Sequence, residues 1–194
     1  MTRTAYHHGA LRQALIDGAK EILAERGHEQ FSLKEVARRA GVSTSAPYRH
    51  FDTREDLLNA VAAEGYVKLH QSLVQAAATT DDAGERLLRL GGAYVRFAQE
   101  HPGLFVTMFR SRSGTAAAHD SFDVLLRTVG EAQRAELIFS DPSAELMARS
   151  IWATLHGLAA LSLRGPYERF GMDEPPEDLA ATTLATLLGL KPGT

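Results

Sequence analysis

A glycine and a proline six positions apart, Gly41 and Pro47, constrain the fold of this chain more than any other feature. Gly41 favours a helix end, and the Ser and Thr cluster at residues 43–45 can cap a new helix almost at once. Pro47 lacks a backbone N–H and is tolerated only in the first turn of a helix. The second helix is therefore predicted to begin near residue 44 and to end near residue 50.

Helical patterns flank this segment on both sides. Ser32 and Glu35 form a capping box, in which the Ser side chain accepts a backbone N–H and Glu35 reaches back to the cap. Upstream, residues 9–26 place apolar side chains on one helical stripe. Downstream, Asp52 and Thr53 can cap a long helix. Two short helices joined by a Gly-containing turn and supported by a third form the helix-turn-helix pattern, whose second helix enters the major groove of DNA.

The rest of the sequence consists of helical patterns separated by breakers. The predicted fold class is all-α, with about nine helices and no convincing strand. Residues 1–52 are predicted to form the DNA-binding domain, and residues 53–194 a domain for effector binding and dimerisation. Flexible loops are expected at 110–118 and 171–177. The further helices are expected over residues 83–100, 104–109, 119–139, 143–165 and 177–188.

Composition limits the function classes. The chain has no cysteine, which excludes disulfides, thiolate metal sites and Cys nucleophiles. Its formal net charge is −3, but the charge is +1 over residues 1–60 and −4 over the remainder, which permits a local DNA surface without demonstrating one. No signal peptide is apparent, and the longest charge-free apolar stretch, residues 150–163, is too short to span a bilayer. A cytoplasmic location is expected.

One segment resembles a known family. Residues 32–58, together with 6–12 and 24–27, are similar to the signature of the TetR/AcrR family of transcriptional regulators; the central run reads SLKEVARRAGVSTSAPYRHF and continues DTREDLL. The resemblance implies an all-α regulator with no cofactor and no catalytic activity that binds double-stranded operator DNA as a homodimer. Pro47 departs from the family pattern, which more often has leucine there.

The resemblance assigns roles to individual residues. Tyr48, His50 and Arg54 lie where the family contacts DNA phosphates. The positions near base edges are occupied by Lys34, Ser43, Thr44, Ser45 and Ala46. Two of these assignments have plainer alternatives. Tyr48 can be a core aromatic with a satisfied hydroxyl, and Lys34 can be a solvated charge without a base contact.

A dimer interface is predicted in the last two long helices. Residues 150–163 are apolar around most of the helix, so this helix must be buried on several sides. The family resemblance implies that these two helices form a four-helix bundle between subunits. The predicted interface residues are Trp152, Leu155, Leu158, Leu161, Leu184 and Leu187. The alternative is that both helices belong entirely to the core of one subunit.

An effector pocket is predicted between the middle helices. Trp152 and the pair His156 and Gly157 resemble the Trp…His-Gly signature of one subgroup's C-terminal domain. Family analogy places an apolar cavity there, with few polar groups to orient a small molecule. Its candidate lining is Tyr94, Phe97, Phe105, Met108, Phe109, Phe122, Trp152 and His156. At helical spacing these same side chains are also typical of core.

The predicted function is that of a ligand-released dimeric repressor on a palindromic operator. A ligand-dependent corepressor or activator is an open alternative, because sequence does not reveal the sign of coupling. A helical enzyme is less favoured, since the chain lacks a His-Glu-x-x-His motif, a phosphate-binding glycine loop and a Gly-x-Ser-x-Gly elbow. A ligand-binding bundle without DNA binding is disfavoured by the intact run of residues 48–51.

Overall fold

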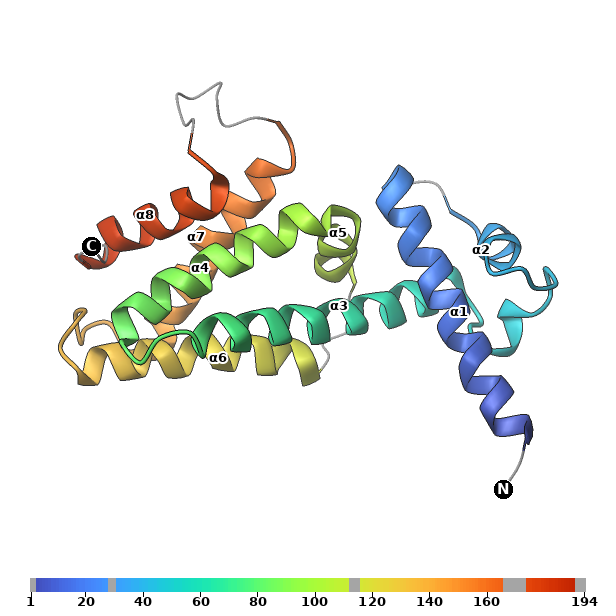
Figure 1. Cartoon of the computed structure of the whole chain (residues 1–194), viewed down its shortest axis with the longest axis horizontal. Coiled ribbons are helices and arrows are strands. Elements are labelled where there is room, and N and C mark those ends of the chain that lie inside the picture. Colours follow the sequence, from blue (N-terminus) through green and yellow to red (C-terminus); the bar gives the residue numbers. More distant parts are fainter. Residues whose placement is uncertain (1–2, 28–30, 112–115, 166–173, 191–194) are drawn as a thin grey trace. The chain divides into compact units, whose positions relative to one another are not determined.

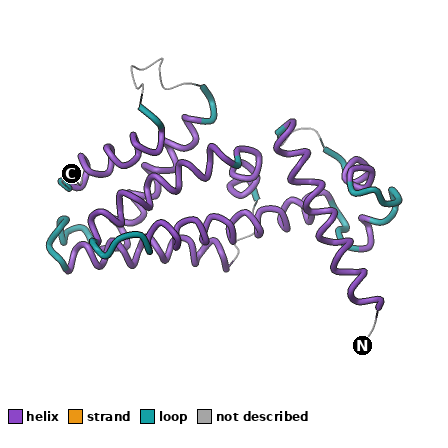
Figure 2. Tube along the Cα trace, in the orientation of Figure 1, coloured by secondary structure: helices purple, strands orange, loops and turns teal. Residues whose placement is uncertain are grey.

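The computed structural model describes residues 3–27, 31–111, 116–165 and 174–190, with side chains from residue 9 onwards. Within these ranges the chain is all helical, with eight α-helices, one 3-10 helix and no strand (Figure 2). The predicted fold class is confirmed. The elements are α1 (Arg3–Arg26), α2 (Leu33–Arg39), η1 (Pro47–Arg49), α3 (Arg54–Ala77), α4 (Ala83–Glu100), α5 (Pro102–Arg110), α6 (Ala116–Arg134), α7 (Ala144–Ser162) and α8 (Pro176–Leu188).

Side-chain caps fix the starts of α2 and α3. The hydroxyl of Ser32 accepts a hydrogen bond from the Glu35 N–H at 3.2 Å, as predicted. The Glu35 carboxylate accepts instead from Arg26 Nη1 at 2.7 Å, so this half of the predicted capping box is wrong. At α3 the box is reciprocal, because Thr53 Oγ1 accepts from the Asp56 N–H at 3.1 Å and Asp56 Oδ2 accepts from the Thr53 N–H at 2.8 Å.

The other predicted boundaries differ mainly at helix ends. α4 spans the predicted residues, whereas α6 ends five residues earlier than the predicted end at residue 139. Glu136 has a φ of 57°, in the left-handed region, which a continuing α-helix does not adopt. Parts of the predicted loops, 112–115 and 171–173, lie outside the described residues. None of the described helices is both long and apolar enough to cross a bilayer.

The chain divides into two compact units. The N-terminal unit contains residues 1–66 and 101–115, and the C-terminal unit contains residues 67–100 and 116–194. Helix α3 therefore contributes its first part to one unit and its last turns to the other. The division by function at residue 52 stays a prediction, since these units are defined by packing alone.

Helices α1, α2 and α3 of the N-terminal unit share one core. Leu15, Ile22, Val36 and Leu57 are each fully buried in it, and Phe51 is 4% exposed. Burying side chains of this size stabilises a fold by about 1.5–3 kcal/mol each. This core fixes α2 and the segment after it against α1 (Figure 1).

Helix α5 also belongs to the N-terminal unit, where it packs on α1. Gly103 permits this approach, because a Cβ at that position would lie 2.3 Å from the carbonyl oxygen of Leu23. The Tyr66 hydroxyl donates to the carbonyl oxygen of Met108 at 3.2 Å, and the Ser111 hydroxyl donates to Asn59 Oδ1 at 2.7 Å. These bonds join α5 and its end to the first part of α3.

Helix α4 is the centre of the C-terminal unit. It contacts α6, α7 and α8, and most of its side chains are buried. Gly91 allows α8 and α7 to come close, since a Cβ there would lie 2.7 Å from Leu184 Cδ1 and 3.2 Å from Leu155 Cδ2. The core of this unit therefore forms around α4, between helices distant in sequence.

Candidate nucleic-acid interface

The turn of the predicted helix-turn-helix is present. Gly41 follows α2 with a φ of +67°, a conformation that glycine adopts without steric cost. The Gly41 N–H donates to Arg38 O at 3.2 Å and the Val42 N–H donates to Ala37 O at 2.9 Å, which closes the end of α2. The chain is thereby redirected within two residues of the helix.

The second helix is shorter than predicted. The sequence favoured a helix from residue 44 to residue 50, whereas η1 covers only Pro47–Arg49 and is a 3-10 helix. Bonds three residues apart dominate here, from the Ala46 N–H to Ser43 O and from the Arg49 N–H to Ala46 O. Pro47 has no N–H to donate to Ser43 O, so it cannot join an α-helical bond pattern with the residues before it.

The polar residues before η1 face solvent. Ser43, Thr44 and Ser45 are exposed, and the hydroxyls of Ser43 and Ser45 lie 3.2 Å apart. Ala46, however, is only 9% exposed. The expectation that Ala46 lies near base edges stays a prediction, and its small side chain offers little surface for such a contact.

Tyr48 is an exposed aromatic side chain. Half of its surface, 50%, is open to solvent. A core tyrosine would be covered, so the alternative of a core aromatic is excluded. Lys34, at the start of α2, is exposed as well. Both side chains are available to a ligand at the surface of the N-terminal unit.

His50 and Arg54 are half buried beside aromatic rings. The ring centroids of His50 and Phe51 are 6.5 Å apart and tilted, and the Arg54 guanidinium carbon lies 4.7 Å from the centre of the Phe31 ring. A guanidinium over an aromatic face is held in orientation while its edge stays able to donate hydrogen bonds. The ring therefore positions Arg54 at the start of α3.

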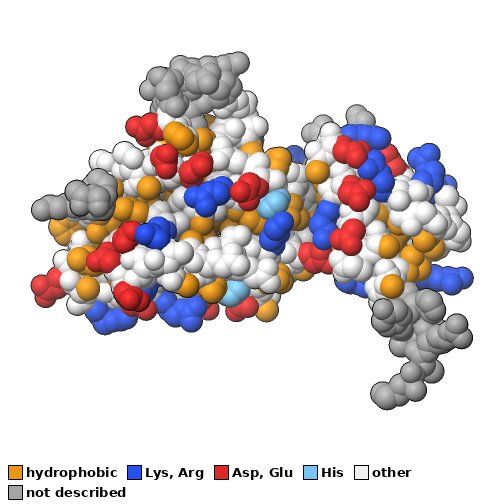
Figure 3. Space-filling model, viewed as in Figure 1, with side chains coloured by type: hydrophobic (Ala, Val, Ile, Leu, Met, Phe, Trp, Pro, Cys, Tyr) orange, Lys and Arg blue, Asp and Glu red, His pale blue; other side chains and the backbone are white. Residues whose placement is uncertain are grey.

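Three basic side chains of the N-terminal unit are engaged in ion pairs. Lys20 pairs with Asp17 at 2.8 Å and with Glu64 at 2.5 Å, and Arg26 pairs with Glu35. Arg39 makes two 2.6 Å bonds to the carboxylate of Glu25. These pairs neutralise Lys20, Arg26 and Arg39, and Figure 3 shows basic and acidic side chains mixed on the face that it draws.

Three other basic side chains are exposed and have no acidic partner among the described residues. These are Lys34, Arg38 and Arg49. Lys34 and Arg38 are four residues apart on α2 and so share one helix face. A fourth, Arg12, lies with its guanidinium carbon 5.4 Å from the centre of the Phe51 ring. Sequence reasoning identified only Lys34, although the four-residue spacing was a usable signal for Arg38.

The predicted pocket residues are divided between the units. Phe105, Met108 and Phe109 lie on α5 in the N-terminal unit, whereas the others lie on α4, α6 and α7 in the C-terminal unit. Phe105 and Met108 are buried, and Phe109 is partly buried. Phe97 is 2% exposed and Phe122 partly exposed. The predicted lining therefore belongs to two separately packed units rather than to one.

Three of the predicted residues in the C-terminal unit form one group. The Tyr94 hydroxyl and His156 Nδ1 are 3.0 Å apart, and the rings of Trp152 and His156 stack with centroids 5.7 Å apart. Tyr94 is buried, whereas Trp152 is 39% exposed. His156 thus connects a buried hydroxyl on α4 to an exposed ring on α7.

Burial lowers the pKa of His156 below its usual value of 6.5. The unfolded chain then takes up a proton at a higher pH than the folded chain, so the free energy of unfolding is expected to fall as the pH drops through 6.5. His156→Gln should show a smaller loss of stability than wild type between about pH 8 and pH 5.5, measured by urea denaturation. The control is His119→Gln at an exposed position. Equal losses in wild type and His156→Gln would contradict this prediction.

The predicted interface residues fall into two groups. Trp152, Leu161 and Leu187 are exposed, the latter two by 54% and 60%, and Leu158 is half buried. Leu155 and Leu184 are 2% and 0% exposed and pack on Gly91 of α4. Since such side chains cannot reach a second subunit, the interface role expected for Leu155 and Leu184 is corrected.

Comparison with known proteins identifies the family. The profile of "Bacterial regulatory proteins, tetR family" matches residues 15–61, and that of "Tetracyclin repressor-like, C-terminal domain" matches residues 87–187. The second profile alone spans more than half of the chain. The first profile includes the whole segment from α2 to η1, and the second includes nearly all of the helices from α4 to α8.

Solved structures with similar folds agree with this result. A protein of unknown function from Rhodococcus sp. RHA1 is 34% identical with a TM-score of 0.76, over 94% of this chain and 97% of its own. The TetR family transcriptional regulator PfmR from Thermus thermophilus is 21% identical with a TM-score of 0.70, over 92% and 99%. RolR in complex with resorcinol is 21% identical with a TM-score of 0.67, over 96% and 91%. By profile and by fold, this chain belongs to the tetR family of bacterial regulatory proteins and is a DNA-binding transcriptional regulator.

Proposed function

We propose that this regulator binds a palindromic operator as a homodimer in the cytoplasm and is released from it by a small-molecule effector. The observation that supports DNA binding is the surface around η1. There the hydroxyls of residues 43–45 and the Tyr48 ring are exposed, and Lys34, Arg38 and Arg49 lack acidic partners among the described residues. A surface of this kind suits a phosphate backbone, which supplies most of the affinity in DNA binding.

Two kinds of contact follow from this surface. Tyr48, His50 and Arg54 contact phosphates, and Arg49 adds a further cation beside them. Ser43, Thr44 and Ser45 face the base edges, with Lys34 reaching from α2. The 3-10 turn is short, so one copy reads few base pairs, and a two-fold dimer is needed for a specific site.

Arg54→Ala is expected to weaken binding to specific and to random duplexes by a similar factor, because phosphate contacts carry no sequence information. Thr44→Ala is expected to change the preference between bases by about 1–3 kcal/mol. Both are measured by fluorescence anisotropy against the operator and a scrambled duplex. Arg96→Ala, which removes an exposed cation from α4 in the C-terminal unit, is the control for net charge. Unchanged operator affinity in Arg54→Ala at moderate salt would remove that residue from the interface.

The dimer is assigned to α7 and α8. Exposed apolar side chains on these helices, Trp152, Leu161 and Leu187, support this assignment. Gly157 adds to it, because a Cβ at this position would meet nothing within 4 Å and the α7 surface is therefore open there. Small residues at a helix surface allow a second helix to approach closely.

The proposal that a small-molecule effector binds is supported by the fold and by the aromatic residues of the C-terminal unit. RolR, a protein of the same fold, was solved with resorcinol, a small aromatic molecule. An effector that prefers one conformer shifts the population by its differential affinity alone. Helix α3, which has residues in both units, is the element on which such a shift would act.

A gel-shift titration on the intergenic region upstream of the gene tests the proposal. We expect a discrete complex with a palindromic fragment, and loss of that complex when the effector is added. A ligand that tightens the complex would replace release by corepression. Turnover of a small molecule without any specific DNA complex would favour the helical enzyme and would overturn the proposal.

A further inference from the structure

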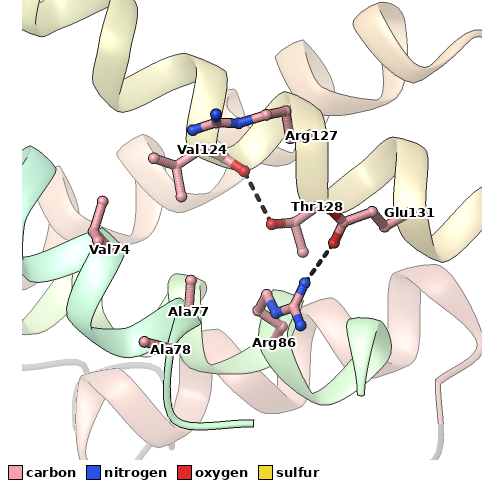
Figure 4. A pocket seen from close by; sticks show the side chains of 8 residues that line it. All are labelled: Val74, Ala77, Ala78, Arg86, Val124, Arg127, Thr128 and Glu131. Carbon is pink, nitrogen blue, oxygen red and sulfur yellow. Dashed lines mark hydrogen bonds and ion pairs between the residues drawn. The ribbon is translucent and has the colours of Figure 1, made fainter. Parts of the chain in front are cut away.

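The C-terminal unit has a hollow of about 290 Å³ beside the turn between α3 and α4. Figure 4 shows its walls, which come from the end of α3, the start of α4 and the middle of α6. Its apolar lining consists of Val74, Ala77, Ala78 and Val124. Charged and polar groups from α4 and α6 complete it. All of these residues belong to the same compact unit.

Arg86 forms one wall of the hollow, and its guanidinium is engaged in an ion pair and hydrogen bonds within the protein. Its Nη1 pairs with the Glu131 carboxylate on α6 (Figure 4). Its Nη2 donates to Thr80 O at 3.1 Å and to Asp81 O at 3.2 Å. These bonds tie the α3–α4 turn to α6 and neutralise Glu131. The wall is therefore fixed, and neither charge of the pair is left for a ligand.

Arg127 is the third charged residue that lines the hollow. It lies on the α6 rim next to Val124, is exposed, and has no ion-pair partner among the described residues (Figure 4). Glu131 is one helical turn away but is already paired with Arg86. Thr128, between them, donates its hydroxyl to Val124 O at 2.9 Å. The hollow thus combines apolar side chains with the guanidinium of Arg127, which has no ion-pair partner among the described residues.

We propose that this hollow binds a small carboxylic acid, whose apolar body packs on Val74, Ala77 and Val124 and whose carboxylate pairs with Arg127. Guanidinium groups bind carboxylates through two parallel hydrogen bonds. The volume is at the lower end of the range for ligand sites, about 300–1,000 Å³, so the ligand is a single ring or a short chain. A cationic ligand is disfavoured by the positive charge of Arg127.

As a regulatory site, the hollow rests on the function proposed above. Three of its lining residues lie at the C-terminal end of α3 or directly after it. The same helix begins with Arg54, which is assigned to the DNA interface. A ligand that packs against the end of α3 favours the conformer in which the hollow is formed, and so it biases the helix that both units share.

Calorimetric titration of the full chain with benzoate tests the site, with hexanoate as the aliphatic probe and benzamide as the uncharged one. We expect both carboxylates to bind and benzamide to bind at least tenfold more weakly. Arg127→Gln should weaken benzoate binding at least tenfold, which corresponds to about 1.4 kcal/mol. Ala77→Phe should fill the hollow and abolish binding of both carboxylates.

Two comparisons make the result decisive. Arg96→Gln removes an exposed charge elsewhere on the C-terminal unit and should leave benzoate binding within twofold of wild type. Thermal unfolding of each variant confirms that it is folded. Absence of binding by either carboxylate, equal binding of benzoate and benzamide, or an unchanged affinity in Arg127→Gln would each overturn the proposal.

The operator complex separates this proposal from the proposed function. If wild type binds its operator but no carboxylate, the site is wrong and the DNA-binding function stands. If carboxylates bind in the Arg127-dependent way but no duplex is bound specifically, the site stands and the proposed function is wrong. Regulation at this site further requires that benzoate changes operator affinity in wild type and not in Arg127→Gln.

Discussion

Replacing Leu161 and Leu187 together by glutamate is expected to yield monomers and to weaken operator binding at least a hundredfold. Leu161 on α7 and Leu187 on α8 are 54% and 60% exposed in the isolated chain. In the proposed dimer they face a second copy, where an unpaired carboxylate is costly to bury. A hundredfold loss of affinity corresponds to about 2.8 kcal/mol. A monomer keeps only one of the two half-site contacts, so the loss of binding free energy is expected to be at least this large.

Sedimentation equilibrium and anisotropy measure the two effects in the same preparations. The matched control is Phe139→Glu, which makes the same kind of change at a residue that is 71% exposed between α6 and α7. This control should stay dimeric and should bind the operator like wild type. If the double variant remains a dimer at micromolar concentration, the interface does not lie on α7 and α8.

Gly103→Ala is expected to destabilise the protein by about 1–3 kcal/mol, the cost of forcing an extra methyl into a packed contact. The added Cβ would lie 2.3 Å from Leu23 O and 2.7 Å from Leu23 C. Both are backbone atoms of α1, which cannot rotate away as the end of a side chain can. Helix α5 must therefore move away from α1, and its contacts with the first part of α3 should weaken.

Thermal denaturation of Gly103→Ala should show a midpoint lower by several degrees. Gly130→Ala on α6 is the control, because its Cβ would meet only the flexible end of Arg134, at 3.3 Å. That variant should be neutral or slightly more stable, since Ala is the better helix former. A midpoint for Gly103→Ala equal to that of the control would show that α5 does not pack on α1 in this way.

Local signals in the sequence predicted the helices well. The cap at Ser32, the cap at Thr53 and the helix end at Gly41 depend on a few neighbouring residues, and all three occur as expected. The predicted α-helix after Gly41 was less accurate. Pro47 was recognised as a constraint on where the helix starts, but the sequence did not show that the element is a single 3-10 turn, Pro47–Arg49.

It was harder to predict which side chains of a helix are buried and which are exposed. Residues 150–163 are apolar all round, so the sequence could not separate Leu155, which faces α4, from Leu161, which is exposed. That distinction depends on Gly91, a residue far away in the sequence that lets α7 and α8 approach. The burial of Ala46 was not predicted either, because a small residue in a polar cluster gives no sign of its burial.

The docking of α5 on α1 also escaped sequence analysis. Residues 101–111 follow α4 directly, yet they belong to the N-terminal unit. The close approach at Gly103 is a contact between segments far apart in the sequence, and no periodicity encodes it. Arg38 was overlooked although its spacing from Lys34 was a usable signal, whereas Arg49 could be recognised only once the structure showed which basic side chains have acidic partners.

In the proposed dimer, the exposed surface around η1 of each subunit binds operator DNA through phosphates. The most direct test is the operator affinity of the full chain as salt is raised from about 50 to 200 mM, with a scrambled duplex alongside. The account predicts a steep linear fall of log affinity with log salt, of about three to five decades, and a clear preference for the operator. Binding that ignores salt, or that fails to distinguish the two duplexes at every concentration, would contradict it.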